Sequence, residues 1–130
     1  MTVAFLSVGA IIIGNLLVGI HDVNRFLADH DSITEASLSA FKRVASRNMI
    51  AAVASIPLGV AFIGLGIYMV IAGGWEGRVL VPVASIALVS IGLAGRASEK
   101  RSQALPCEPD LNGEYQRICM IWKKSIWPSF

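Results

Sequence analysis

Three polar side chains inside otherwise apolar stretches are the residues of this sequence best placed to form a site within a membrane. Asn15 carries an amide in a run of Ile, Leu and Val, and Ser55 and Ser90 carry hydroxyls in two further apolar runs. A rise of about 1.5 Å per helical residue places the three side chains at one depth. An amide in hydrocarbon needs a hydrogen-bonding partner. We therefore expect one polar layer, which either joins the helices or lines a path for water, an ion or a small ligand.

No other group of residues has the composition of a catalytic or metal site. The sequence lacks a nucleophile elbow, a glycine-rich phosphate loop and an H-E-x-x-H motif. His21 is a weak candidate axial ligand for a haem or pigment, because no His or Cys at metal-ligand spacing accompanies it. Cys107 and Cys119 are expected to be free thiols in a reducing compartment. We expect no metal, no cofactor and no enzymatic activity.

Hydropathy predicts the elements that hold these residues. Apolar residues make up 55% of the 130-residue chain, and charged residues avoid three windows that each approach the length of a membrane-crossing helix. The prediction is an all-α integral membrane protein with three transmembrane helices, a cytoplasmic helical extension and an amphipathic C-terminal tail. The expected spans are 3–20, 49–73 and 79–95, with a helical hairpin at 21–48 and a tail at 104–130. The third window is the shortest, so a re-entrant segment is its alternative.

Basic residues predict the orientation. They lie between the first and second spans (Arg25, Lys42, Arg43, Arg47) and after the third (Arg96, Lys100, Arg101), whereas the turn between the second and third spans holds only Arg78. Under the positive-inside rule the N-terminus lies outside, and the hairpin and tail lie in the cytoplasm, in an inner or plasma membrane. The net charge of +2 is too small to indicate nucleic acid as a partner.

Local signals predict where helices begin, bend and turn. The sequence from Ser32 to Glu35 has the pattern of a capping box, which predicts a helix start. Pro57 is expected to kink the second span, because proline lacks a donor and frees the carbonyl of Val53. Residues 73–78 are expected to form a short turn between antiparallel spans.

Small residues predict where helices approach closely. Ala10 and Gly14 lie four residues apart in the first span, and Gly59 follows the proline of the second. Such residues let two backbones pack together in lipid, where close packing drives helix association. Each of these positions is a candidate helix contact.

Basic and aromatic residues predict contacts at the cytoplasmic surface. Lys42, Arg43 and Arg47 are expected either to set topology alone or to bind a lipid headgroup or a partner. The tail repeats apolar residues at helical spacing and carries Trp122 and Trp127. This stripe is expected to lie on the membrane surface, with docking on a partner subunit as the alternative.

These features favour a non-catalytic function. The sequence predicts a small membrane subunit that packs against other membrane subunits or against itself and so stabilises or scaffolds a complex. The alternative is a homo-oligomeric pore or small transporter lined by the polar layer around Asn15. The expected partners are membrane lipids and other membrane subunits or further copies of the chain.

Overall fold

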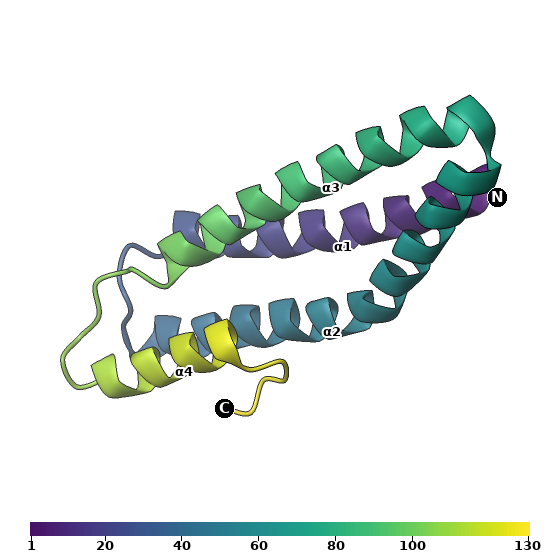
Figure 1. Ribbon diagram of the computed structural model, residues 1–130. Helices are drawn as coiled ribbons and strands as arrows, with labels where there is room; N and C mark the ends of the chain where they lie inside the picture. Colours follow the sequence, from purple (N-terminus) through teal and green to yellow (C-terminus); the bar gives the residue numbers. More distant parts are fainter.

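The chain folds into four helices, described here from a computed structural model of residues 1–130 (Figure 1). The helices are α1 (Thr2–Asp29), α2 (Glu35–Ala72), α3 (Gly74–Ser102) and α4 (Asn112–Lys124). The first three are long and apolar enough to cross a membrane. The prediction of an all-α protein with three such helices is confirmed.

Helix α1 continues past its apolar run without a break. Its 28 residues correspond to a length of about 42 Å, which exceeds the hydrocarbon thickness of about 30 Å. The residues beyond Ile20 stay helical because an apolar stripe continues through Val23 and Phe26, both of which are buried. The second half of α1 therefore contributes to a packed core as well as to the apolar segment.

Helix α2 begins two residues later than the sequence indicates, with a different capping pair. Thr34 is the N-cap: its hydroxyl accepts from the Ser37 amide at 3.4 Å, and its own amide donates to Ser37 Oγ at 2.6 Å. The predicted capping box of Ser32 and Glu35 is therefore wrong. The preceding residue, Ile33, forms a backbone bridge to Cys107 and is fully buried. This tertiary pairing keeps the chain extended, so the helix starts only after it.

Helix α2 bends in its middle and reverses into α3 through a single residue. Figure 1 shows a bend near the middle of α2, and the helix contains Pro57 in its interior. Gly73 alone separates α2 from α3, so residues 74–78, predicted as part of a turn, are helical. Gly74 has a φ of +66°, and a Cβ on Gly77 would overlap the carbonyl oxygen of Met69. Glycine at these positions lets the two helices meet this closely.

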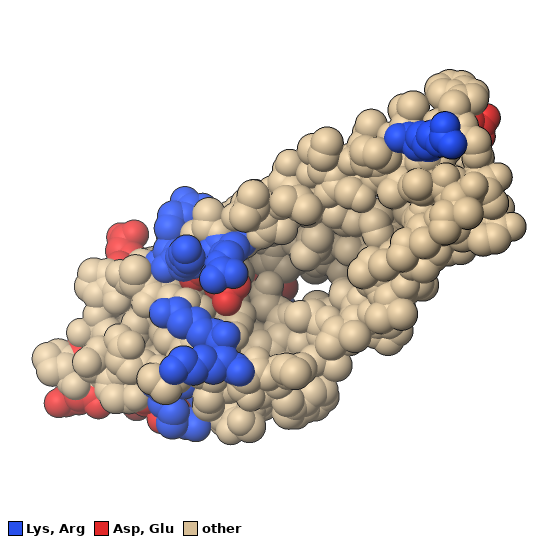
Figure 2. Space-filling view, in the orientation of Figure 1, with Lys and Arg blue, Asp and Glu red and all other residues tan.

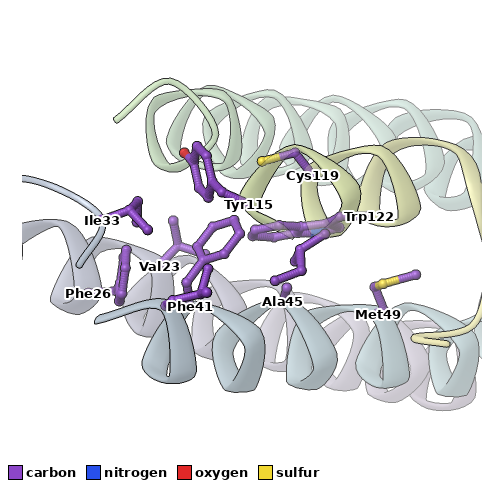
Figure 3. Close-up of a cluster of buried hydrophobic side chains, with 11 residues drawn as sticks. Val23, Phe26, Ile33, Phe41, Ala45, Met49, Tyr115, Cys119 and Trp122 are labelled. Atoms are coloured by element: carbon purple, nitrogen blue, oxygen red, sulfur yellow. The ribbon is translucent and has the colours of Figure 1, made fainter. Parts of the chain in front are cut away.

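Two hydrophobic clusters stabilise opposite ends of the molecule. The smaller cluster lies near the turn, where the rings of Phe5 and Phe62 stack with centroids 4.6 Å apart and Met69 is buried with them. The larger cluster has 11 buried residues and joins α1, α2, α4 and the segment before α2 (Figure 3). Between these clusters, α2 and α3 diverge (Figure 1).

Helix α4 packs on the chain itself. The ring of Phe41 on α2 lies 5.1 Å from the ring of Tyr115 and 5.7 Å from the ring of Trp122, measured between centroids (Figure 3). The Tyr115 hydroxyl donates to the Ser102 carbonyl at 2.5 Å and accepts from the Leu105 amide at 3.3 Å. The stripe expected on lipid or on a partner is thus mostly buried within the chain, because α2 presents an apolar face to it.

Candidate functional site: a cleft between the four helices

The structure brings together two of the three residues of the expected polar layer. The side-chain amide of Asn15 donates to Ser55 Oγ at 3.2 Å, and Ser55 Oγ donates to the Ala51 carbonyl at 2.8 Å. Ser90 of α3 is exposed and forms no side-chain hydrogen bond. The polar contact therefore joins α1 to α2 and does not extend to α3.

This pair lies on the wall of a cleft between the four helices. The cleft has a volume of about 960 Å³ and is lined by residues from all four helices. Figure 2 shows the surface hollowed between α3 and α2, where these helices diverge. Its position explains why the sequence did not reveal it: the cleft depends on the bend of α2 and on where α4 docks.

Small residues make the floor of the cleft. A Cβ on Gly19 would lie 2.7 Å from Asn48 Oδ1, and a Cβ on Gly95 would lie 3.1 Å from Ile20 Cγ1. Glycine at these two positions lets α1 approach both neighbouring helices. Gly92, one turn from Gly95, has no atom within 4 Å of the position that a Cβ would occupy, so the cleft is open at that point.

The inner wall of the cleft is apolar with a few amide and hydroxyl groups. Leu16, Ile20, Val53 and Ile56 contribute hydrocarbon surface there. Among the polar groups on the wall, Asn48 donates its side-chain amide to the Val44 carbonyl at 3.0 Å. No buried side-chain nitrogen or oxygen of the chain lacks a partner. The wall is therefore suited to hydrocarbon more than to a polar solute.

The rim of the cleft carries four cations. Arg96 and Lys100 lie one turn apart on α3, and Lys123 and Lys124 end α4. None of them forms an ion pair, because the two ion pairs of the chain join Glu114 to Lys42 and to Arg117. Figure 2 shows basic side chains gathered over these parts of α3 and α4, beside the hollow.

One carboxylate lies among these cations. Glu99 Oε1 accepts from Gln103 Nε2 at 3.3 Å. Burial raises the pKa of Glu99, and the Gln103 hydrogen bond and the charges of Arg96 and Lys123 offset part of that rise. A single, partly buried carboxylate does not neutralise four cations, so the rim is electropositive.

The predicted basic and aromatic contact residues lie in different surroundings. Lys42 pairs with Glu114 at 3.2 Å and links α2 to α4, whereas Arg43 and Arg47 are exposed and form no ion pair. The hydrogen bond from Arg117 and then that from Lys42 lower the pKa of Glu114 to about 2. Trp122 is only 9% exposed and lines the cleft, whereas Trp127 is 58% exposed.

The small residues predicted to contact another helix have no close neighbour within the chain. Ala10 and Gly14 are exposed on α1, and no atom lies within 4 Å of a Cβ position at Gly14 or Gly59. The glycines in contact include Gly9, whose Cβ position is 3.3 Å from the Phe62 ring, and Gly66, at 3.5 Å from the Phe5 ring. Sequence reasoning missed these because each contact depends on an aromatic ring of another helix.

The remaining chemical candidates lie apart. His21 is exposed on α1, and no three His, Cys, Asp or Glu side chains come together in a way that could hold a metal ion. Cys119 is buried and Cys107 is partly buried, and both are free thiols. Burial raises the pKa of the Cys119 thiol, which disfavours its reactive thiolate.

Comparison with protein families, curated proteins and solved structures finds no match to this chain. The two features that stand out are an amphipathic cleft and a set of long apolar helices with open small-residue faces.

Proposed function

We propose that the chain is a non-catalytic subunit of an inner or plasma membrane, which packs against other membrane subunits or against itself. This proposal rests on the exposed small residues of the outer face of α1. Ala10 and Gly14 are exposed there, and no atom of the chain fills the space beside Gly14. A small-residue pair of this spacing lets a second helix approach closely in lipid.

The charges support an orientation with the N-terminus outside and the α4 end in the cytoplasm. Basic residues concentrate at the α4 end of the molecule (Figure 2). Arg78 lies in the first turns of α3, close to the junction with α2. The hairpin 21–48 and the tail 104–130 are then cytoplasmic under the positive-inside rule. An impermeant thiol reagent should label Cys107 only after the membrane is permeabilised, and labelling in intact cells would reverse this orientation.

Substitution of the α1 face tests the association. Ala10→Leu combined with Gly14→Leu should lower the oligomeric mass, or the yield of co-purified membrane subunits, in a mild detergent. The matched control is Gly64→Leu, because Gly64 is also exposed with no atom within 4 Å of its Cβ position, but on α2. Unchanged assembly of the double variant, with normal helicity, would show that this face is not the interface.

A homo-oligomeric pore or small transporter is the second candidate function. The observation that favours it is the group of polar side chains of Asn15, Ser55 and Asn48, which all line one cleft within otherwise apolar helices. The purified protein should then conduct ions in liposomes, and Asn15→Leu should abolish that conductance. Absence of conductance in reconstituted, assembled protein would reject this candidate.

A further inference from the structure

The cleft is amphipathic along its length. Its inner part is bounded by hydrocarbon side chains of α1 and α2, including Leu16, Ile20 and Ile56. Its rim is formed by charged side chains of α3 and by the C-terminal end of α4. An occupant that satisfies both parts needs an apolar chain and an anionic group.

The positive charges of the rim are only partly compensated within the chain. Four cations surround the cleft, no carboxylate lies within ion-pair distance of any of them, and Glu99 is the only acidic residue on the lining. An anion placed between Arg96 and Lys100 on one side and Lys123 and Lys124 on the other would be attracted by all four. Both arginine and lysine are suited to binding phosphate oxygens.

The depth of the rim matches the boundary of a membrane. The uncharged window of α3 ends at Gly95, and Arg96 and Lys100 occupy the next turn. Cations at this level lie where lipid phosphates lie, and each is attracted to an anionic membrane surface. The inner part of the cleft, by contrast, lies between the apolar windows of α1, α2 and α3.

We propose that the cleft binds one membrane lipid with an anionic headgroup. Its phosphate lies among Arg96, Lys100, Lys123 and Lys124, and an acyl chain lies along α1 between the diverging helices α2 and α3. The volume of about 960 Å³ is near the upper end of the range of about 300 to 1,000 Å³ for ligand sites. The lipid fills a space that the chain leaves open, and it is held whether or not the subunit associates with others.

Trp122 provides a built-in reporter, because it lines the cleft and is otherwise buried. A Trp75→Phe, Trp127→Phe background leaves it as the only tryptophan of the three in the chain. Both replaced residues are exposed, at 73% and 58%, so the fold should tolerate the change. Phosphatidylglycerol with brominated acyl chains is then titrated into the protein in dodecyl maltoside micelles, and quenching of Trp122 fluorescence is measured.

The expected result is saturable quenching by brominated phosphatidylglycerol at a concentration at least about tenfold lower than for brominated phosphatidylcholine. Inorganic phosphate at equal concentration should not displace the lipid, because it lacks the acyl chain. Equal quenching by the two lipids would overturn the anionic site. Displacement by inorganic phosphate would assign the rim to a free anion and overturn the lipid.

Charge variants with opposite expected signs separate binding from misfolding. Arg96→Gln with Lys100→Gln should weaken quenching by phosphatidylglycerol about tenfold or more, whereas Arg43→Gln with Arg47→Gln, at the same end of the molecule but outside the cleft, should not. Glu99→Gln should tighten binding several-fold, because it removes the one like charge on the lining. Equal losses in the two double variants would show only general attraction to an anionic surface and overturn the site.

A steric variant tests the acyl-chain part independently. Gly92→Leu adds a side chain where no atom lies within 4 Å and should reduce quenching by occupying the cleft. Gly64→Leu is the matched control, because it adds the same group in open space outside the cleft. Normal phosphatidylglycerol binding by Gly92→Leu would show that the chain of the lipid lies elsewhere and overturn the proposed position.

Discussion

At the scale of single residues, the polar side chains near the middle of α1 and α2 form few hydrogen bonds. Asn15 has one side-chain partner, Ser55, and Ser55 has a second partner in the Ala51 carbonyl. Loss of the amide would therefore leave the serine hydroxyl satisfied. This arrangement limits the energetic importance of the contact between α1 and α2.

Replacement of Asn15 by Leu should lower the stability of the protein modestly. The lost hydrogen bond corresponds to about 0.6 to 2 kcal/mol by comparison with interhelical bonds in membranes. Thermal unfolding in a mild detergent measures the change. Ser90→Ala is the control and should have no effect, since Ser90 is exposed and forms no side-chain hydrogen bond. A larger loss for Ser90→Ala would contradict the observed pairing.

Replacement of Glu99 by Gln should stabilise the protein at neutral pH. Burial raises the folded-state pKa of Glu99 above 4.5, so the ionised carboxylate is disfavoured in the folded state relative to the unfolded state. The penalty applies above the folded pKa and disappears as the pH falls below the unfolded value. The difference in melting temperature between variant and wild type should therefore be positive at pH 7 and vanish near pH 4. A gain that persists at pH 4 would point to another cause.

At the scale of elements, the ends of the helices depend on contacts that local sequence does not show. A pattern of Ser and Glu three apart indicates a cap at Ser32, but burial of Ile33 against the segment around Cys107 moves the cap to Thr34. The turn between α2 and α3 shortens in the same way, because Gly77 packs directly on the backbone at Met69. Tertiary pairing overrides the local signal in both places.

Gly77→Ala should open the junction of α2 and α3. The added methyl group overlaps the Met69 carbonyl oxygen, a backbone atom that cannot rotate away. The expected loss exceeds about 1 kcal/mol in unfolding measured in mild detergent. Gly64→Ala should instead be neutral or stabilising, because Gly64 is helical with open space around it and alanine favours helix. Equal effects of the two variants would contradict the close approach at Gly77.

At the scale of the whole molecule, hydrophobic clusters pack both ends, and a cleft lies between the helices in the middle. The larger cluster packs α4 against α1 and α2. The smaller cluster packs α1, α2 and α3 together near the turn between α2 and α3. Between them, the bend of α2 separates it from α3 and leaves the cleft (Figure 1). The docking of α4 therefore brings Lys123 and Lys124 to the rim, where Arg96 and Lys100 of α3 also lie.

Phe41→Ala should release α4 from the rest of the molecule. Phe41 is fully buried and contacts the rings of Phe26, Tyr115 and Trp122, so its truncation should cost about 3 to 5 kcal/mol. Alkylation of Cys119, which is 2% exposed, should accelerate strongly. Phe62→Ala, in the other cluster, should not accelerate it. Unchanged protection of Cys119 in Phe41→Ala would show that α4 is held by other contacts.

The sequence by itself determined the three long apolar helices and the separation of charge between the two ends. Hydrocarbon imposes a simple length and composition on a helix that crosses it, and both properties are readable along a single stretch of chain. The same holds for the choice of Asn15 and Ser55 as polar residues in those helices, since polar groups in apolar runs are conspicuous.

Only the tertiary structure decided where the α4 stripe lies, which glycines make contacts and where the cleft opens. An amphipathic face is satisfied equally well by lipid, by a partner or by another part of the chain, and its sequence is the same in each case. In this chain the apolar face of α4 packs on α2, where the Phe41 ring contacts the rings of Tyr115 and Trp122. The cleft arises from the direction of a bend and the position of a docked helix, and no local pattern of residues encodes either.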